Sequence, residues 1–165
     1  MKKAIFLLAM VLLNSIQATF AQKADEKSVI ESLAGTWQYV EEVTKADGQK
    51  AYIGRKIYKT ITTDKKYQVM ISVDIPLKEE NSEETTVSTI SFITQKGEIE
   101  ITSDNTYLEY IHNHFMDKNL NNTISNLRFR FGENKNIIYI EYNLGGESDV
   151  NWISEVWVRV LPLGA

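Results

Sequence analysis

The segment KYQVMISVD at residues 66–74 alternates apolar and mostly polar side chains. Positions 67, 69, 71 and 73 hold Tyr, Val, Ile and Val, which fall on one face of an extended chain, because successive side chains of a strand point to opposite faces. The residues between them would face water. This period of two predicts an antiparallel strand with one buried face.

The same alternation recurs along most of the chain. It predicts nine strands near residues 36–44, 55–63, 66–75, 85–95, 98–103, 106–112, 124–132, 137–143 and 152–161. Turn residues separate them at Asp47-Gly48, Thr63-Asp64, Gly97, Asp104-Asn105, Gly132-Glu133-Asn134 and Gly145-Gly146. Pro76 is expected to end the third strand, and the acidic stretch 78–84 to form a solvated loop. Many short strands joined by tight turns predict an all-β domain, a sandwich or an up-and-down antiparallel β-barrel of about 8–9 strands.

An outer-membrane barrel is an alternative, because its strands also alternate, with apolar residues facing outward. The predicted strands lack the regular aromatic girdle that is typical of such barrels. The alternation therefore favours a barrel or sandwich with an apolar interior.

A short helix is predicted before the first strand, from Asp25 to Leu33. Asp25 can cap it, Val29, Ile30 and Leu33 share one face at helical spacing, and Gly35 ends it.

The N-terminus has the layout of a secretory signal peptide. Lys2 and Lys3 give a positive start, residues 4–13 are almost purely apolar, and small residues follow as far as Ala21. The apolar run is too short for a membrane span, which needs about 20 such residues. We therefore predict an exported protein, periplasmic or secreted, whose signal peptide (residues 1–21) is cleaved after about Ala21. The alternative is an uncleaved anchor.

Cleavage would leave one domain, residues 22–165, which is long enough to bury its own core. The chain has no cysteine, which excludes disulfides and a lipoprotein anchor on a Cys at the cleavage point. The full chain has 18 Lys and Arg and 22 Asp and Glu, and loss of two lysines with the signal leaves 16 against 22, a net charge of −6. This acidic balance argues against nucleic acid and anionic membranes as partners. No second long apolar run occurs, so no integral membrane segment is expected in the mature domain.

Three segments carry a resemblance to a known family. Gly35-Thr36-Trp37 opens the first predicted strand, Trp157-Val158-Arg159 lies in the last, and TYLEYIHNH at residues 106–114 lies between them. Gly-x-Trp after a short helix resembles the lipocalin signature, and the mature chain resembles the lipocalin-like domains of unknown function of exported bacterial proteins. The resemblance implies a lipocalin-like barrel and no particular activity.

In lipocalins an arginine from near the end of the barrel packs over the first tryptophan, so the resemblance implies that Arg159 covers Trp37 and closes one end. A guanidinium over an indole face contributes about 0.5–2 kcal/mol. The alternative is that Arg159 points into the lumen and binds a ligand carboxylate. The chain stops soon after its last strand, where lipocalins often carry a helix, which leaves the smaller fatty-acid-binding type of barrel open.

Acidic and aromatic residues on the predicted strands are the candidates for ligand binding. Glu109 shares a face with Tyr107, and Glu155 can face the interior from the last strand. A carboxylate in an apolar cavity has a raised pKa and can hold a polar group of a ligand. The alternative is that both acids lie on the solvated face or pair with Arg128 or Arg130. The full candidate set is Tyr107, Glu109, Tyr110, His112, Phe129 and Glu155.

We expect the barrel to bind a small hydrophobic or amphipathic molecule, because such sites are mostly apolar and aromatic with a few polar groups. The aromatic residues of a narrow barrel can also simply fill it, and the sequence does not distinguish a filled barrel from a hollow one. An alternative is a protein-binding, inhibitor-like module that acts through loops at residues 45–54, 76–85 and 113–123.

A metal-dependent enzyme is a third alternative. His112 and His114 share a face of a regular strand, and Asp117 supplies a third ligand only if the loop turns back. The chain has no nucleophile elbow, P-loop or dinucleotide fingerprint. We therefore predict no catalytic centre, no resident metal and no cofactor.

Overall fold

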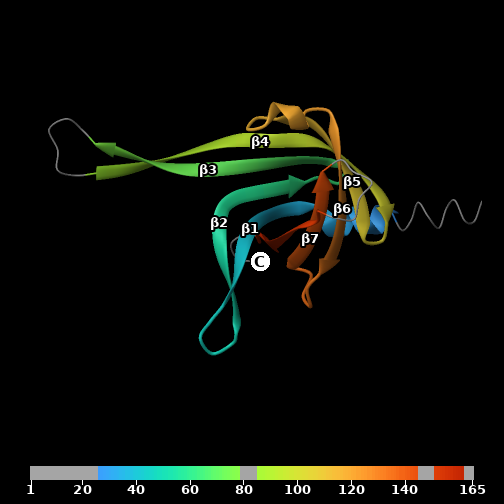
Figure 1. Cartoon of the computed structure of the whole chain (residues 1–165), viewed down its shortest axis with the longest axis horizontal. Coiled ribbons are helices and arrows are strands. Elements are labelled where there is room, and N and C mark those ends of the chain that lie inside the picture. The colour runs from blue at the N-terminus through green and yellow to red at the C-terminus, as the bar shows by residue number, and fades with distance from the viewer. Residues whose placement is uncertain (1–25, 79–84, 145–150, 162–165) are drawn as a thin grey trace, which may run out of the picture.

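A computed structural model describes residues 26–78, 85–144 and 151–161. Within these ranges, eight antiparallel strands follow one another around a closed barrel, and β1 pairs with β8 to close it (Figure 1). The strands are β1 (Gly35–Thr44), β2 (Lys50–Ile61), β3 (Lys66–Lys78), β4 (Thr85–Ser103), β5 (Thr106–His114), β6 (Thr123–Phe131), β7 (Ile137–Leu144) and β8 (Ile153–Arg159). A helix over residues 26–33 precedes β1, and the short 3-10 helix η1 (Lys118–Leu120) lies between β5 and β6. The prediction of an up-and-down barrel with a short N-terminal helix is confirmed.

The predicted turn at Gly97 is wrong, and this is why eight strands are found where nine were expected. β4 runs without a break through Gly97, where its pairing with β5 shifts register. A Cβ atom at Gly97 would lie 1.9 Å from the carbonyl oxygen of Tyr110. The glycine therefore allows close approach of the β5 backbone at a bulge.

The prediction that Pro76 ends the third strand is also wrong. β3 continues to Lys78, and Pro76 pairs with Val87 of β4. The pairing of β2 with β3 begins only at Ile57 and Ile71. In the described part of the chain, Pro76 therefore has a strand neighbour on one side only, a position that proline tolerates.

Four features expected from the sequence lie outside the described residues. They are the signal peptide, the capping Asp25, residues 79–84 of the acidic loop, and the Gly145-Gly146 turn.

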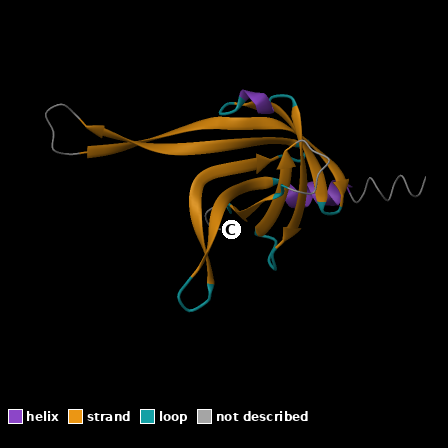
Figure 2. Cartoon of the chain, viewed as in Figure 1, coloured by secondary structure: helices purple, strands orange, loops and turns teal. Residues whose placement is uncertain are grey.

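The outer parts of β3 and β4 extend beyond the barrel as a two-stranded arm, the β3–β4 arm (residues 72–78 and 85–91), which Figures 1 and 2 show projecting away from the other strands. Several large apolar side chains of this arm are exposed: Val73, Ile75, Leu77, Val87 and Ile90. The arm thus leaves apolar surface in contact with water.

One end of the barrel, called here the Trp37 end, is filled. Trp37 is 2% exposed, and its indole nitrogen donates a hydrogen bond to the carbonyl of Leu33 at 2.8 Å. The guanidinium of Arg159 lies over the Trp37 ring, 4.1 Å from its centroid, and donates to the carbonyls of Ala34 and Ser32 at 2.6 and 2.7 Å. The predicted contact between Arg159 and Trp37 is present, and the alternative of a lumenal Arg159 is wrong.

Gly35 belongs to the same arrangement. Its φ is +136°, and a Cβ atom on it would lie 2.5 Å from the Arg159 guanidinium. Glycine is therefore needed at the first residue of β1, both for the backbone conformation and for the space that the arginine occupies. The main apolar cluster lies around this end: Ile30, Leu33, Trp37, Ile61, Tyr67, Ile99, Tyr107, Leu127, Phe129, Ile138, Ile140 and Trp157.

None of the described helices is both long and apolar enough to cross a membrane.

Candidate functional site

The barrel encloses a cavity of about 210 Å³ between the apolar cluster and the end opposite Trp37, called here the cavity end. Every strand contributes at least one lining residue, because inward-facing side chains alternate along each strand. His114, Leu120 and Leu144 lie at the cavity end, close to the termini of β5, η1 and β7. The remaining lining residues are Tyr39, Ile57, Lys59, Val69, Gln95, Glu109, Ile111, Ser125, Leu127, Tyr142, Glu155 and Trp157. Cavities that hold drug-sized ligands are about 300–1,000 Å³, so this cavity suits a smaller molecule.

A buried ion pair crosses the cavity. The ammonium of Lys59 on β2 contacts the carboxylate of Glu109 on β5, and the two side chains are 7% and 4% exposed. The Lys59 ammonium also lies 5.2 Å from the centroid of the Tyr67 ring. A charge buried here without a partner would carry a large desolvation cost, so each member of the pair makes burial of the other tolerable.

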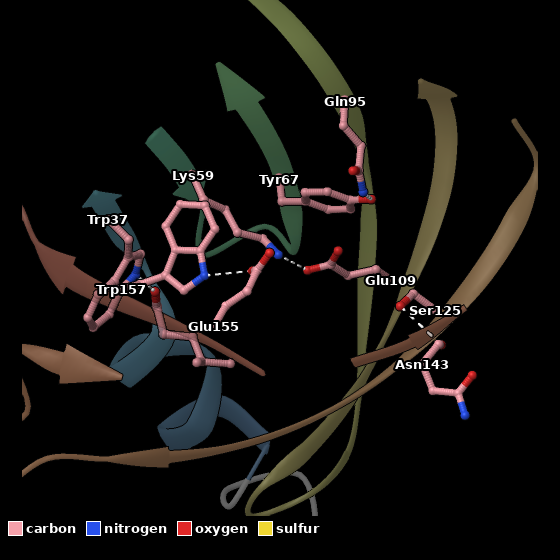
Figure 3. Close-up of polar contacts among 10 residues, drawn as sticks. Trp37, Lys59, Tyr67, Gln95, Glu109, Ser125, Asn143, Glu155 and Trp157 are labelled. Atoms are coloured by element: carbon pink, nitrogen blue, oxygen red, sulfur yellow. Dashed lines mark hydrogen bonds and ion pairs between the residues drawn. The ribbon is translucent and has the colours of Figure 1, made fainter. Parts of the chain in front are cut away.

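A second carboxylate, Glu155 on β8, lies on the other side of Lys59. Figure 3 shows the end of the Lys59 side chain between Glu109 and Glu155. Glu155 accepts a hydrogen bond from the indole nitrogen of Trp157 at 2.9 Å. Burial raises the pKa of Glu155 above its ordinary value of 4.5, and the nearby Glu109 adds to this, whereas Lys59 and the Trp157 hydrogen bond oppose it.

Aromatic residues surround Glu155. Tyr39 meets Trp157 edge to face, with ring centroids 5.5 Å apart. Tyr142 also lines the cavity, and burial together with the charge of Glu155 raises the pKa of its hydroxyl. Tyr39, Tyr142 and Trp157 therefore form a neutral, polarisable wall around a carboxylate.

The opposite wall carries amide and hydroxyl groups. Gln95 donates from its side-chain nitrogen to the hydroxyl of Tyr67 at 2.7 Å, and Ser125 donates to the backbone carbonyl of Asn143 at 3.3 Å. The cavity thus combines charged, polar and apolar surface, which suits an amphipathic molecule better than a wholly apolar one.

Four of the six ligand-binding candidates from the sequence lie inside the barrel. Glu109 and Glu155 line the cavity. Tyr107 and Phe129 are buried in the apolar cluster with ring centroids 5.8 Å apart, and within the described ranges the Tyr107 hydroxyl has no hydrogen-bond partner. Among the residues that the structure describes, neither acid pairs with Arg128 or Arg130: Glu109 pairs with Lys59, and Arg128 pairs with Glu141 on the outer surface.

Tyr110 and His112 point away from the cavity. The Tyr110 hydroxyl donates a hydrogen bond to the Glu100 carboxylate at 2.5 Å. His112 lines an exposed groove on the outer surface, and its Nε2 atom lies 3.9 Å from the Glu98 carboxylate. Both occupy even positions of β5, whereas Tyr107 and Glu109 occupy odd ones, so the alternation itself separates them. Neither residue can contact a ligand held in the cavity.

The expectation that His112 and His114 share a face is wrong. β5 reaches His114, but its pairing is irregular next to Gly97, so His114 turns to line the cavity while His112 lines the outer groove. The Nδ1 atom of His114 accepts a hydrogen bond from the backbone of Asp117 at 2.8 Å. Among the described residues, no three His, Asp or Glu side chains lie close enough together to hold a metal.

Lys59 is the main residue of the cavity that the sequence analysis missed. It occupies an inward position on β2, on the same face of the strand as Ile57 and Ile61. A lysine in the middle of an apolar face is a signal of a buried pair, because lysine is almost never fully buried without a partner.

A family model described as a domain of unknown function (DUF4488) matches residues 32–163, which include all eight strands. A search of the curated proteins found no match.

Proposed function

The chain belongs to the DUF4488 family of domains of unknown function, and we propose that its barrel binds a small amphipathic molecule in the cavity. The observation that carries the proposal is a hollow of about 210 Å³ lined by both apolar and buried polar side chains. A barrel that served only as a scaffold would gain stability by filling this space with apolar side chains. In this proposal the protein binds its ligand without catalysing a reaction.

Two further features belong to the proposal. The barrel is lipocalin-like, which is supported by Gly35, Trp37 and Arg159 at its filled end. The protein is exported to the periplasm or beyond, which is supported by the N-terminal pattern of residues 1–21. N-terminal sequencing of the protein expressed with its full leader tests export: we expect the mature chain to begin at Gln22, and an intact Met1 on the exported protein would contradict this.

Native mass spectrometry of the full chain, expressed with its leader, tests ligand binding. We expect an adduct of at most a few hundred daltons on the wild type. Val69→Trp, which fills the cavity from β3, should abolish the adduct, whereas Gln68→Trp on the exposed face of the same strand should keep it. An adduct that survives in Val69→Trp, or a bare wild-type chain that also binds none of the probes described below, would overturn the proposal.

Protein binding through the β3–β4 arm is a second candidate function. It is supported by the exposed side chains of Val73, Ile75 and Leu77 on one face of the arm, next to an edge of β3 that, in the described part of the chain, does not pair with β2. Exposed apolar surface beside a free edge suits an extended segment of another chain with alternating apolar residues. Capture of a partner protein by the wild type and the variants tests this function. We expect Val69→Trp to retain the partner and the double variant Ile75→Lys/Leu77→Lys to lose it. Equal capture by the arm variant and the wild type would contradict this function.

A further inference from the structure

We propose that the molecule held in the cavity is a small organic cation, an ammonium group on a compact apolar body, and that the Glu155 carboxylate receives the ammonium. This inference rests on the proposed function, since it names the chemical class of ligand for the same cavity.

The charged side chains of the cavity do not balance. The described residues that line the cavity include one lysine and two glutamates, and Lys59 is in direct contact with Glu109. Glu155 therefore has no ion pair of its own among the described residues and shares the charge of Lys59 with Glu109. A half-buried carboxylate in this position favours binding either a proton or a second cation.

Glu155 also has hydrogen-bonding capacity to spare. The indole of Trp157 supplies the one side-chain hydrogen bond that the described structure gives this carboxylate. A carboxylate has about four lone-pair sites, so acceptor capacity remains on the side that faces the cavity. An ammonium donates three hydrogen bonds, and charge-assisted bonds of this kind are about twice as strong as neutral ones.

Aromatic rings line the cavity next to Glu155. Tyr39, Tyr142 and Trp157 all line the cavity beside Glu155, and Tyr39 contacts Trp157 edge to face. The negative face of an aromatic ring attracts a cation, and groups of aromatic rings are used to recognise organic ammonium ions. The same rings would shield the apolar part of the ligand from water.

The cavity is less suited to an anion. Lys59 is engaged by Glu109, and the guanidinium of Arg159 donates to Ser32 and Ala34 at the Trp37 end. An anionic ligand would therefore add charge to a site that already has an excess of carboxylate. Amphipathic ligands with a neutral head would leave Glu155 without a counter-charge.

The ligand competes with a proton for Glu155. The groups that face this carboxylate are Lys59 from β2, Glu109 and the Tyr107 hydroxyl from β5, Tyr142 from β7 and Tyr39 from β1, with Trp157 on its own strand. Protonation removes the negative charge that attracts the ammonium. Binding of the cation should therefore weaken as the pH falls through the raised pKa of Glu155.

Isothermal titration of the full chain with benzylamine, benzyl alcohol and benzoate tests the inference, because the three probes share a ring and differ in charge. We expect benzylamine to bind at least about tenfold more tightly than either of the others at neutral pH, the size of one charge-assisted hydrogen bond. Glu155→Gln should bring the affinity for benzylamine down to that for benzyl alcohol. Glu141→Gln, a matched loss of an outward-facing carboxylate that pairs with Arg128, should leave it unchanged.

The failures of the two proposals can be told apart. Benzyl alcohol or benzoate binding as tightly as benzylamine, or an affinity for benzylamine that Glu155→Gln does not change, would overturn the cationic ligand and leave the binding function intact. Binding of none of the three would overturn the cationic ligand, and together with a bare chain in native mass spectrometry it would overturn the binding function as well. Unfolding curves of Glu155→Gln and Glu141→Gln show that both variants are folded before they are compared.

Discussion

Trp37 and Trp157 lie in the same barrel, yet their surroundings differ. Both are nearly fully buried, and both indole nitrogens donate a hydrogen bond. Trp37, whose ring lies under the guanidinium of Arg159, donates to the backbone carbonyl of Leu33, whereas Trp157 donates to the Glu155 carboxylate at the cavity.

The difference shows how one alternating pattern gives a barrel with two kinds of interior. At the Trp37 end the inward positions hold large apolar residues, and the polar groups of Arg159 are satisfied by backbone carbonyls. Towards the cavity end the inward positions hold Lys59, Glu109 and Glu155, which cannot pack as an apolar core. The first region accounts for stability, and the second for the proposed binding.

The largest effect is expected from removing the centre of the Trp37 end. Trp37→Ala should lower the free energy of unfolding by about 4 kcal/mol, because it leaves a void and removes the partner of Arg159. Phe115→Ala, at a side chain that is 66% exposed, should change it by less than about 1 kcal/mol. Urea unfolding measures both. Equal losses in the two variants would break the proposed division of the barrel.

The buried ion pair comes next. Lys59→Met should cost about 3 kcal/mol at neutral pH, because it leaves the Glu109 carboxylate buried without its cation. The double variant Lys59→Met/Glu109→Leu should recover most of that loss, since it removes the unpaired charge. Urea unfolding of both variants and the wild type tests this. A double variant as unstable as Lys59→Met would show that lost packing, and not the unpaired charge, lowers the free energy of unfolding.

Glu155 should have a smaller effect, visible in the dependence of stability on pH. Its pKa is raised above 4.5 in the folded protein, so the folded state binds this proton more tightly than the unfolded chain does. The resulting stability is present below about pH 4.5 and is lost as the pH rises through the raised value. Glu155→Gln should therefore become more stable relative to the wild type as the pH rises from 4 to 8. A difference between the two unfolding free energies that does not change with pH would contradict the buried environment of Glu155.

The smallest effect is expected on the β3–β4 arm, which lies outside both regions. Leu77→Lys should change the free energy of unfolding by less than about 0.5 kcal/mol, because this side chain is 50% exposed. Thermal unfolding measures the change. Loss of cooperative unfolding in this variant would show that the arm is part of the folding unit that the barrel forms.

Much of this architecture follows from local pattern. The alternation in residues 66–74 and its recurrence predicted the barrel, and Gly35, Trp37 and Arg159 predicted which residues meet at its filled end. The errors at Gly97 and Pro76 share one cause. Glycine and proline mark turns in a single sequence, but here a bulge beside Tyr110 and a strand edge without a β2 neighbour accommodate them.

The cavity was less predictable, because its contacts join strands far apart in sequence. Lys59 and Glu109 are separated by 50 positions, and no pattern within either strand pairs them. The alternation along β5 does predict that Tyr110 and His112 lie on the opposite face of the strand from Glu109. The position of His114 depends on an irregular pairing next to Gly97, which a regular strand does not predict.

The two tryptophans report directly on the division of the barrel into a filled end and a binding cavity. A titration of the isotope-labelled protein with benzylamine follows the indole N–H resonances of its three tryptophans by two-dimensional NMR. We expect a saturable shift of the Trp157 resonance, because its acceptor Glu155 would bind the ammonium, and an unchanged Trp37 resonance at the filled end. A Trp157 resonance that stays in place at saturating benzylamine, or a Trp37 resonance that shifts as much, would contradict a barrel divided into a filled end and a binding cavity.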